Sequence, residues 1–249
     1  YRFIENDSYS TPDDGRHVCW TARLFGATLP FYLKTLKVVL KYRSVALRGE
    51  LDHKRWVESS LVWSEVIEQC KGRIEISGRE HIRALDGPAV FVGNHMSTAE
   101  AFLLPGVIVS ILPLTFVVKD ALVDQPLFGH IMRASDPITV SRDNSRADLK
   151  KVMTSGKEHL AKGTSVLIFP QSTRSPVFDE SKFNSLGAKL AGRAGVPVVP
   201  FAVKTDMWST GRLIKDLGPI LPEKTVHLKF GPAIPADVDS KTAQQRIVA

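Results

Sequence analysis

The segment VFVGNHMSTAEAF, residues 90–102, indicates the fold class of this chain. It begins with a short run of β-branched and aromatic residues, which is typical of a buried strand. Gly93 ends the run, and Ser97 and Glu100 then have the spacing of a capping box, which predicts a helix start at Ser97 or Thr98. A strand that passes through a short polar turn into a helix is the repeating unit of α/β sheets.

The same alternation of predicted strands and helices recurs along the chain. Further short apolar runs occupy residues 73–76, 114–118, 137–140, 165–169, 196–203 and 226–230. Helical periodicity at residues 148–162 and 185–194 ends at a glycine in both cases, which is a common helix stop. This alternation predicts an α/β domain with a mostly parallel or mixed central sheet covered by helices. The polar tail from Asp237 is expected to fray.

The totals narrow the choice of partners. A chain of 249 residues is long enough for one sizeable domain, and its net charge of +7 favours an anionic partner: nucleic acid, an anionic membrane surface or a phosphate-bearing substrate. Cys19 and Cys70 lack metal-ligand or redox spacing, so neither a metal nor a disulfide framework is expected. An uncharged apolar run of the roughly 18 residues needed to span a bilayer is also absent from the sequence.

The basic charge is concentrated near the N-terminus. Residues 16–55 carry nine Lys and Arg residues against Glu50 and Asp52, interleaved with aliphatic and aromatic residues at near-helical spacing. Pro30 is expected to begin the second of two amphipathic helices. This pattern predicts an arm over residues 1–56 that docks on a membrane, followed by a domain over residues 57–249. The alternative is that the apolar faces pack on the domain; nucleic-acid binding is disfavoured because a polar basic stripe and a known motif are both missing.

Three predicted strands lead into polar loops with reactive or basic residues. His95, Arg142 and Arg174 follow the runs at 89–92, 137–140 and 165–169. Parallel strands would bring these ends to one edge of the sheet, where α/β proteins bind ligands. An imidazole beside guanidinium groups suits a phosphate-bearing alcohol, since arginine binds phosphate and histidine takes a hydroxyl proton. Taken singly, each residue has a plainer interpretation: a helix-capping Glu100, a structural histidine and solvated arginines.

Four blocks, in this order, resemble the glycerolipid acyltransferases, specifically the 1-acyl-glycerol-3-phosphate O-acyltransferase (lysophosphatidate acyltransferase) family. The first is Asn94-His95 with an acid at position 100, and the second ends at Arg142. The third is FPQSTRS at 169–175 and the fourth is VPVVP at 196–200. Lys119 and a Pro-x-x-Gly at 126–129 also fall where the family has them, and the similarity spans residues 74–234.

The resemblance implies a mechanism and a set of residues. His95 would deprotonate a glycerol-backbone hydroxyl that attacks the thioester of an acyl-CoA or acyl carrier protein, and Glu100 would orient the imidazole. Arg142 and Arg174 would bind the phosphate of a lysophospholipid, with help from Lys119. The wider substrate-binding set is Asn94, Ser97, Lys119, Arg142, Gln171, Ser172, Thr173 and Arg174, and the acyl-pocket or structural motif is Val196, Pro197 and Pro200. It implies no metal or other cofactor, and a peripheral, monotopic protein at the cytoplasmic face of the membrane.

The chain departs from the family pattern at three positions. Glu100 replaces an aspartate, Gln171 a glutamate and Ser172 a glycine. These changes leave two alternatives open: an acyltransferase for a different lysolipid acceptor, and a catalytically inactive relative that binds lipid.

Overall fold

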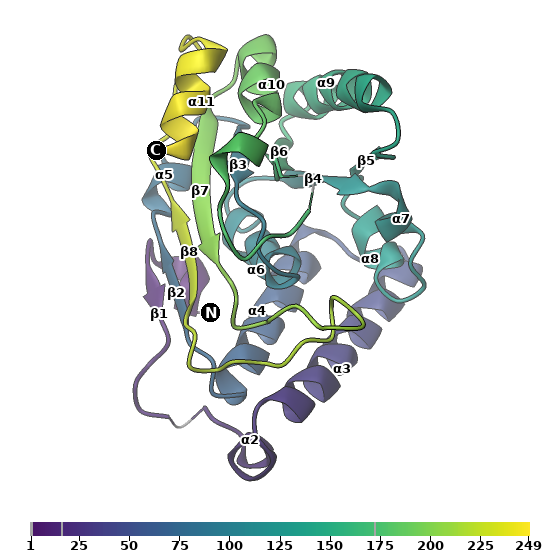
Figure 1. Ribbon diagram of the computed structural model, residues 1–249, viewed down its shortest axis with the longest axis vertical. Coiled ribbons are helices and arrows are strands. Elements are labelled where there is room, and N and C mark those ends of the chain that lie inside the picture. Colours follow the sequence, from purple (N-terminus) through teal and green to yellow (C-terminus); the bar gives the residue numbers. More distant parts are fainter. Residues whose placement is uncertain (1, 16, 172) are drawn as a thin grey trace.

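The computed structural model describes residues 2–15, 17–171 and 173–249 (Figure 1). Within these residues the centre of the molecule is an eight-stranded sheet in the order β1-β2-β8-β7-β3-β6-β4-β5. The strands are β1 (Tyr9–Ser10), β2 (Ile74–Ser77), β3 (Val90–Gly93), β4 (Leu114–Lys119), β5 (Ile138–Val140), β6 (Ser165–Ile168), β7 (Val198–Lys204) and β8 (Val226–Phe230).

The sheet is mixed, and its parallel part carries the ends that matter for function. β7, β3, β6, β4 and β5 run parallel to one another, whereas β8 is antiparallel to β7, β2 is parallel to β8 and β1 is antiparallel to β2. The carboxyl ends of the five parallel strands therefore meet at one edge. This confirms the predicted α/β sheet and its seven apolar runs, whereas the two-residue β1 is too short to leave a periodic pattern.

Helices cover both faces of the sheet (Figure 1). Alternate residues of β3 point into two hydrophobic clusters: Val90 and Val92 into the cluster shared with α9, α10 and α11, and Phe91 into the cluster shared with α3, α4 and α6. The helices are α1 (Arg2–Glu5), α2 (Trp20–Phe25), α3 (Thr28–Leu47), α4 (His53–Gln69), α5 (Glu80–Arg83), α6 (Ala99–Ile108), α7 (Asp120–Val123), α8 (Gly129–Arg133), α9 (Ser145–Ala161), the 3-10 helix η1 (Glu180–Lys182), α10 (Leu186–Ala194) and α11 (Ser240–Val248).

The C-terminal tail corrects one expectation. Instead of fraying, it forms α11, which packs beside α10. Asp239 caps this helix, because its Oδ1 accepts hydrogen bonds from the amides of Lys241 and Thr242 at 3.0 and 3.1 Å. Ala243 is buried against the sheet. The Asp239 cap, the buried Ala243 and the half-buried Ile247 and Val248 hold a helix whose other residues are mostly polar.

The N-terminal helix α3 has two apolar faces. One face enters the hydrophobic core with Phe31, Val38 and Tyr42. The other is exposed, with relative accessibilities between 43% and 59%, and carries Leu29, Leu33, Leu36, Leu40 and Leu47. The expected boundary at residue 56 lies inside α4, and α3, α4 and the sheet share one hydrophobic cluster. In the described part of the chain, no helix combines the length and the apolar content required to cross a bilayer.

Candidate active site

The turn after β3 is fixed to the neighbouring strand β7 by Asn94. Its Nδ2 donates to the carbonyl of Val203 at 2.9 Å, and its Oδ1 accepts from the amide of Val203 at 2.7 Å. Gly93, just before it, leaves room for the ring of Phe201, which would lie 2.4 Å from an added Cβ. Asn94 therefore extends the β3–β7 pairing by one residue and sets the direction in which the next side chain, His95, leaves the sheet.

We expect Asn94→Ala to lower the free energy of unfolding by about 1–3 kcal/mol, because two hydrogen bonds are lost and the backbone groups of Val203 are left without these partners. Chemical denaturation followed by circular dichroism measures this change. Asn184→Ala is the matched control, since its amide also bonds a backbone carbonyl, that of Pro170, but away from the β3–β7 pairing. Equal unfolding free energies for Asn94→Ala and the unmodified protein would show that the turn holds without it.

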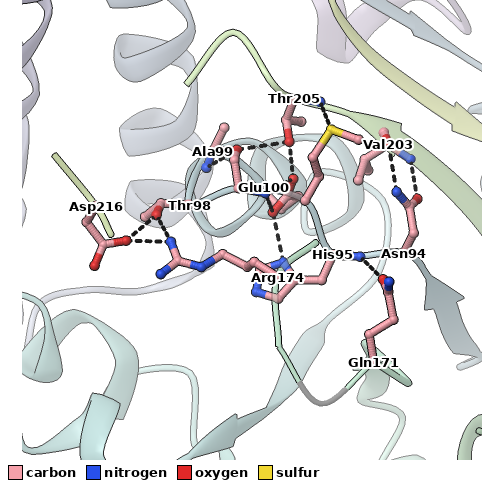
Figure 2. A network of polar contacts seen from close by, with 12 residues as sticks. Asn94, His95, Thr98, Ala99, Glu100, Gln171, Arg174, Val203, Thr205 and Asp216 are labelled. Atoms are coloured by element: carbon pink, nitrogen blue, oxygen red, sulfur yellow. Dashed lines mark hydrogen bonds and ion pairs between the residues drawn. The ribbon is translucent and has the colours of Figure 1, made fainter. Parts of the chain in front are cut away.

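His95 and Glu100 form a hydrogen-bonded pair, with 2.9 Å between His95 Nδ1 and Glu100 Oε2. The Glu100 side chain is fully buried, whereas that of His95 is 23% exposed. The carboxylate also accepts from the amide of Ser97 at 2.9 and 3.1 Å and from the hydroxyl of Thr205 (Figure 2). The acid thus has both of the roles that its spacing predicts, as a partner for histidine and as an acceptor for the helix start.

The details of the helix start differ from the capping box. α6 begins at Ala99 with Thr98 as its N-cap residue, one position later than Ser97. The Ser97 hydroxyl instead accepts from the Ala99 amide at 3.1 Å and donates to Thr205 Oγ1 at 2.9 Å. Ser97 is buried. Its hydroxyl holds the Thr205 hydroxyl, which in turn donates to the Glu100 carboxylate. Direct contacts of Asn94 and Ser97 with a substrate stay predictions.

The surroundings of Glu100 determine which nitrogen of His95 carries the proton. An ionised carboxylate only accepts hydrogen bonds, so Nδ1 carries the hydrogen and Nε2 keeps its lone pair. The ring of Phe169 stacks on the imidazole, with centroids 4.2 Å apart and planes 17° apart. The imidazole is thus held by Glu100 along one edge and by Phe169 over one face, with the basic nitrogen opposite the carboxylate.

The third sequence block fixes the backbone of His95. Gln171 Oε1 accepts from the His95 amide at 2.7 Å, and the amide of Ser175 donates to the His95 carbonyl at 2.9 Å. Gln171 is buried and Thr173 is exposed. Ser172 lies outside the described residues. A neutral glutamine at 171 thus accepts the His95 amide hydrogen without adding a negative charge at this position.

Arg174 is bound within the site by two neighbours. Its Nη1 donates to the Thr98 hydroxyl and to Asp216 Oδ1, and Figure 2 shows the guanidinium directed toward both. Thr98 in turn donates to Asp216 Oδ1 at 2.6 Å. Since Thr98 lies between His95 and Glu100 in the sequence, the structure brings the guanidinium of Arg174 to the same turn as the imidazole, as predicted.

Lys119 and Arg142 lie farther along the same edge. The order β3-β6-β4-β5 places Arg142 three strands from His95, about 14 Å away at ~4.8 Å per strand. Both residues are exposed, and the Arg142 amide donates to Asp148 Oδ2 at 2.7 Å. Arg142 also has a positive φ of 68°, which turns the chain away from β5. A contact of either residue with substrate stays a prediction.

The fourth block joins α10 to the sheet. The Pro197 carbonyl accepts from the Val90 amide at 3.0 Å, and the Pro200 carbonyl accepts from the Gly231 amide at 2.8 Å. Pro200 also pairs in register with Val92 of β3. Pro197 and Pro200 thus lie where β7 runs beside β3, and the Val196 amide donates to the Ala191 carbonyl of α10 at 3.2 Å. A part for these three residues in an acyl pocket stays a prediction.

Three residues of the site carry weak or no sequence signals. Phe169 stands in the third block, but its stacking on His95 depends on the pairing of β3 with β6. Thr205 directly follows β7 and Asp216 belongs to the loop after it, both more than 100 residues from His95 in the sequence. Only the order of strands brings them to the first block, and that order is not readable from spacing.

A mixed α/β sheet with a carboxylate–imidazole pair at the carboxyl ends of its parallel strands is an arrangement suited to general-base catalysis. A family model described as Acyltransferase matches residues 73–204, more than half of the chain. This chain therefore belongs to the acyltransferase family. The match contains His95, Glu100 and Arg174 but ends before Thr205 and Asp216.

Relatives and a solved structure agree with this assignment. A 1-acyl-sn-glycerol-3-phosphate acyltransferase from Pseudomonas aeruginosa is 36% identical over 69% of this chain and 63% of its own length. One from Chlamydomonas reinhardtii is 29% identical over 71% of this chain and 52% of its own length. The matched regions thus span less than two thirds of these relatives' lengths. A crystal structure of the 1-acyl-sn-glycerophosphate (LPA) acyltransferase PlsC from Thermotoga maritima has the same fold, with a TM-score of 0.65, 19% identity and 92% coverage of each chain.

Proposed function

We propose that this protein transfers a fatty acyl group from an acyl thioester, acyl-CoA or acyl carrier protein, to the free hydroxyl of a lysophospholipid. The acceptor we favour is 1-acyl-glycerol-3-phosphate, which would give phosphatidic acid. The observation that supports this most directly is the 2.9 Å contact between His95 Nδ1 and buried Glu100, in a turn whose Thr98 bonds to the guanidinium of Arg174. Two of the relatives are 1-acyl-sn-glycerol-3-phosphate acyltransferases, which supports this class of acceptor.

His95 and Glu100 supply the proton transfers of this reaction. Nε2 of His95 accepts the proton of the acceptor hydroxyl as its oxygen attacks the thioester carbonyl. The imidazolium that forms is stabilised by the Glu100 carboxylate. When the tetrahedral intermediate collapses, the carbon–sulfur bond breaks and the proton passes from Nε2 to the leaving thiolate. An ester and a free thiol result, and His95 returns to its starting state.

Glu100 also bears on the proposal that this protein is active rather than an inactive lipid binder. The family pattern has an aspartate here, and a longer side chain would misplace the imidazole if the backbone were unchanged. Glu100 reaches Nδ1 of His95 at 2.9 Å and keeps its Ser97 and Thr205 donors. The pair therefore has the geometry that general-base catalysis requires.

The test is acyl transfer to a panel of lysolipids. Labelled acyl-CoA and acyl carrier protein are each offered with lysophosphatidate, with lysophospholipids of other headgroups and with an amino-acid-based lysolipid. We expect transfer to lysophosphatidate to be fastest, because Arg174 suits a phosphate monoester. Faster transfer to a lysolipid without a phosphate would contradict lysophosphatidate as the preferred acceptor. Absence of transfer to every acceptor would contradict the proposed reaction.

We also propose that α2 and α3 dock on the cytoplasmic face of a membrane, as a peripheral, monotopic attachment. Leu24 and Phe25 of α2 are 70% and 67% exposed, and the exposed leucine face of α3 continues this apolar surface. Basic residues flank it, including Lys34, Lys37 and Lys41. An apolar surface bordered by cations fits the interface of an anionic leaflet. Figure 1 places α2 and α3 at one end of the molecule.

Reversing the charges at Lys34, Lys37 and Lys41 to glutamate is expected to weaken binding to anionic vesicles by roughly 10²-fold or more, at about 1 kcal/mol per lysine. Added salt is expected to weaken the unmodified protein in the same direction. Vesicle co-sedimentation measures both effects. The matched control makes the same charge change at Lys150, Lys157 and Lys162 of the α9 region, at the other end of the molecule. Equal binding by both triple variants would contradict docking through α3.

A further inference from the structure

The guanidinium of Arg174, which we propose binds the phosphate of the acceptor, is already paired with the carboxylate of Asp216. Arg174 Nη1 donates to Asp216 Oδ1, and Thr98 donates to the same oxygen. Burial raises the pKa of Asp216, but the hydrogen bonds from Thr98 and Arg174 outweigh it, so this pKa lies below its ordinary value. Asp216 is therefore ionised near neutral pH, and a substrate phosphate would have to compete with its carboxylate for Arg174.

The carboxylate belongs to a loop that leaves the sheet after β7. The neck of this loop is closed by Ser209, whose amide and hydroxyl donate to the Pro219 carbonyl at 3.3 and 2.6 Å. Gly218 is required there, because an added Cβ would lie 2.0 Å from the Ser209 carbonyl oxygen. The loop between β7 and β8 extends toward α3 in Figure 1.

Tyr32 of α3 connects this loop to the helix that we propose docks on the membrane. Its hydroxyl donates to the Gly218 carbonyl at 2.6 Å and contacts the Asp216 carbonyl at 3.3 Å. The indole of Trp208 also donates to the Asp216 carbonyl at 3.1 Å. These contacts hold the backbone of Asp216, whereas its carboxylate is held only by Thr98 and Arg174 among the bonds described.

The tip of the loop is apolar and exposed. Leu213 is 99% exposed, and Ile214 and Leu217 are 57% and 58% exposed. Three large aliphatic side chains in water are unfavourable. The bond between Tyr32 and Gly218 attaches this loop to α3, the helix that also exposes a face of leucine side chains. The tip and this helix face are therefore suited to enter the same lipid interface.

We propose that the Asp216 carboxylate is an internal substitute for the phosphate of the acceptor, and that it leaves Arg174 when the Leu213–Ile214 tip enters the lipid. This inference rests on the proposed function. Without substrate, Asp216 keeps the guanidinium in place and neutralises it. With the loop at the interface, the phosphate monoester of a lysolipid takes the position of Asp216 Oδ1. Away from a membrane Asp216 stays on Arg174, so soluble phosphates bind weakly.

The first test measures binding without catalysis, using sn-glycerol 3-phosphate as the probe and isothermal titration calorimetry at low salt. Asp216→Asn is expected to bind the probe at least tenfold more tightly than the unmodified protein, because the competing charge is gone while the side-chain shape is kept. Arg174→Ala, alone or combined with Asp216→Asn, is expected to abolish binding. Unchanged or weaker binding by Asp216→Asn would overturn the proposal and assign Asp216 a purely supporting role.

The control separates local competition from overall charge. Asp206→Asn removes the same charge from the same chain segment, but Asp206 pairs with Lys204 and Lys224 at 3.0 and 2.8 Å. We expect its affinity for the probe to match that of the unmodified protein. An equal gain in both variants would mean that net charge, rather than occupation of Arg174, sets the affinity, and this would also overturn the proposal.

The second test concerns the tip. Phosphatidylcholine vesicles containing phosphatidylglycerol are expected to raise the probe affinity of the unmodified protein, and Leu213→Ser with Ile214→Ser is expected to remove that increase. Asp216→Asn is expected to respond little, since its site is already open. A vesicle response that survives in the double serine variant would overturn the link to the membrane. Both tests use binding, so a failure of the acyl-transfer proposal is seen separately in the lysolipid panel.

Discussion

His95→Ala is expected to reduce the rate of acyl transfer by roughly 10²–10⁴-fold, the range that general-base assistance supplies. The imidazole is partly exposed, and Glu100 keeps its hydrogen bonds from Ser97 and Thr205 when it is removed. The fold should therefore persist while the base is lost. Initial rates with labelled acyl-CoA and lysophosphatidate, beside a thermal melt, measure the two properties separately.

A second histidine–glutamate pair provides the control for this variant. His227 of β8 lies 3.1 Å from Glu75 of β2, on the part of the sheet away from β3, β6 and β4. His227→Ala is expected to leave the rate of acyl transfer unchanged. Equal turnover by His95→Ala and the unmodified protein would rule out His95 as the base.

Glu100→Gln is expected to lower kcat by roughly 10³–10⁴-fold, as the loss of an orienting carboxylate does in a serine-protease triad. The side-chain amide of glutamine can donate to Nδ1, which would move the imidazole hydrogen to Nε2 and remove the base. The change in shape is minimal, but the Ser97 amide and the Thr205 hydroxyl now meet a neutral acceptor. We expect a loss of about 1–3 kcal/mol in the free energy of unfolding.

Glu100→Asp separates charge from reach. It keeps the carboxylate, and it is the residue that the family pattern has, but it is one methylene shorter than the side chain for which this turn is built. Its rate is expected to fall between those of the unmodified protein and Glu100→Gln. A Glu100→Gln variant with full activity would show that the tautomer of His95 is set by another group, and pH–rate profiles of the three proteins check this.

The fold was largely readable because its central strands β3 and β6 are buried on both faces. Runs such as Val90–Val92 are apolar throughout, which separates them clearly from the amphipathic helices around them. Two elements lacked this signal. β1 has two residues and pairs only at the sheet margin, and α11 buries Ala243 alone as a hydrophobic residue, so its sequence is as polar as a loop.

The site was readable where residues are close in sequence or lie in a block. His95 and Glu100 are five positions apart, and Arg174 belongs to the third block. Thr205 and Asp216 were not, because a threonine at a strand end and an aspartate in a loop are common everywhere. Arg142 lies far from His95 because β5 is at the edge of the sheet. This could not be predicted, since the order of parallel strands depends on packing across the whole sheet rather than on a local sequence pattern.

The two-faced helix α3 limits how this protein can be prepared in water without detergent. Deleting the N-terminal segment would uncover its inner contacts, including Phe31 against Trp63 and the Trp63 Nε1 bond to Thr35 Oγ1 at 3.1 Å. Truncation would thus remove the exposed leucine face of α3 but expose the apolar face of α4 that α3 covers. Serine or glutamine in place of Leu33, Leu36 and Leu40 changes only the exposed face of α3. Substituting these leucines is therefore expected to give a monodisperse sample more readily than deleting the helix.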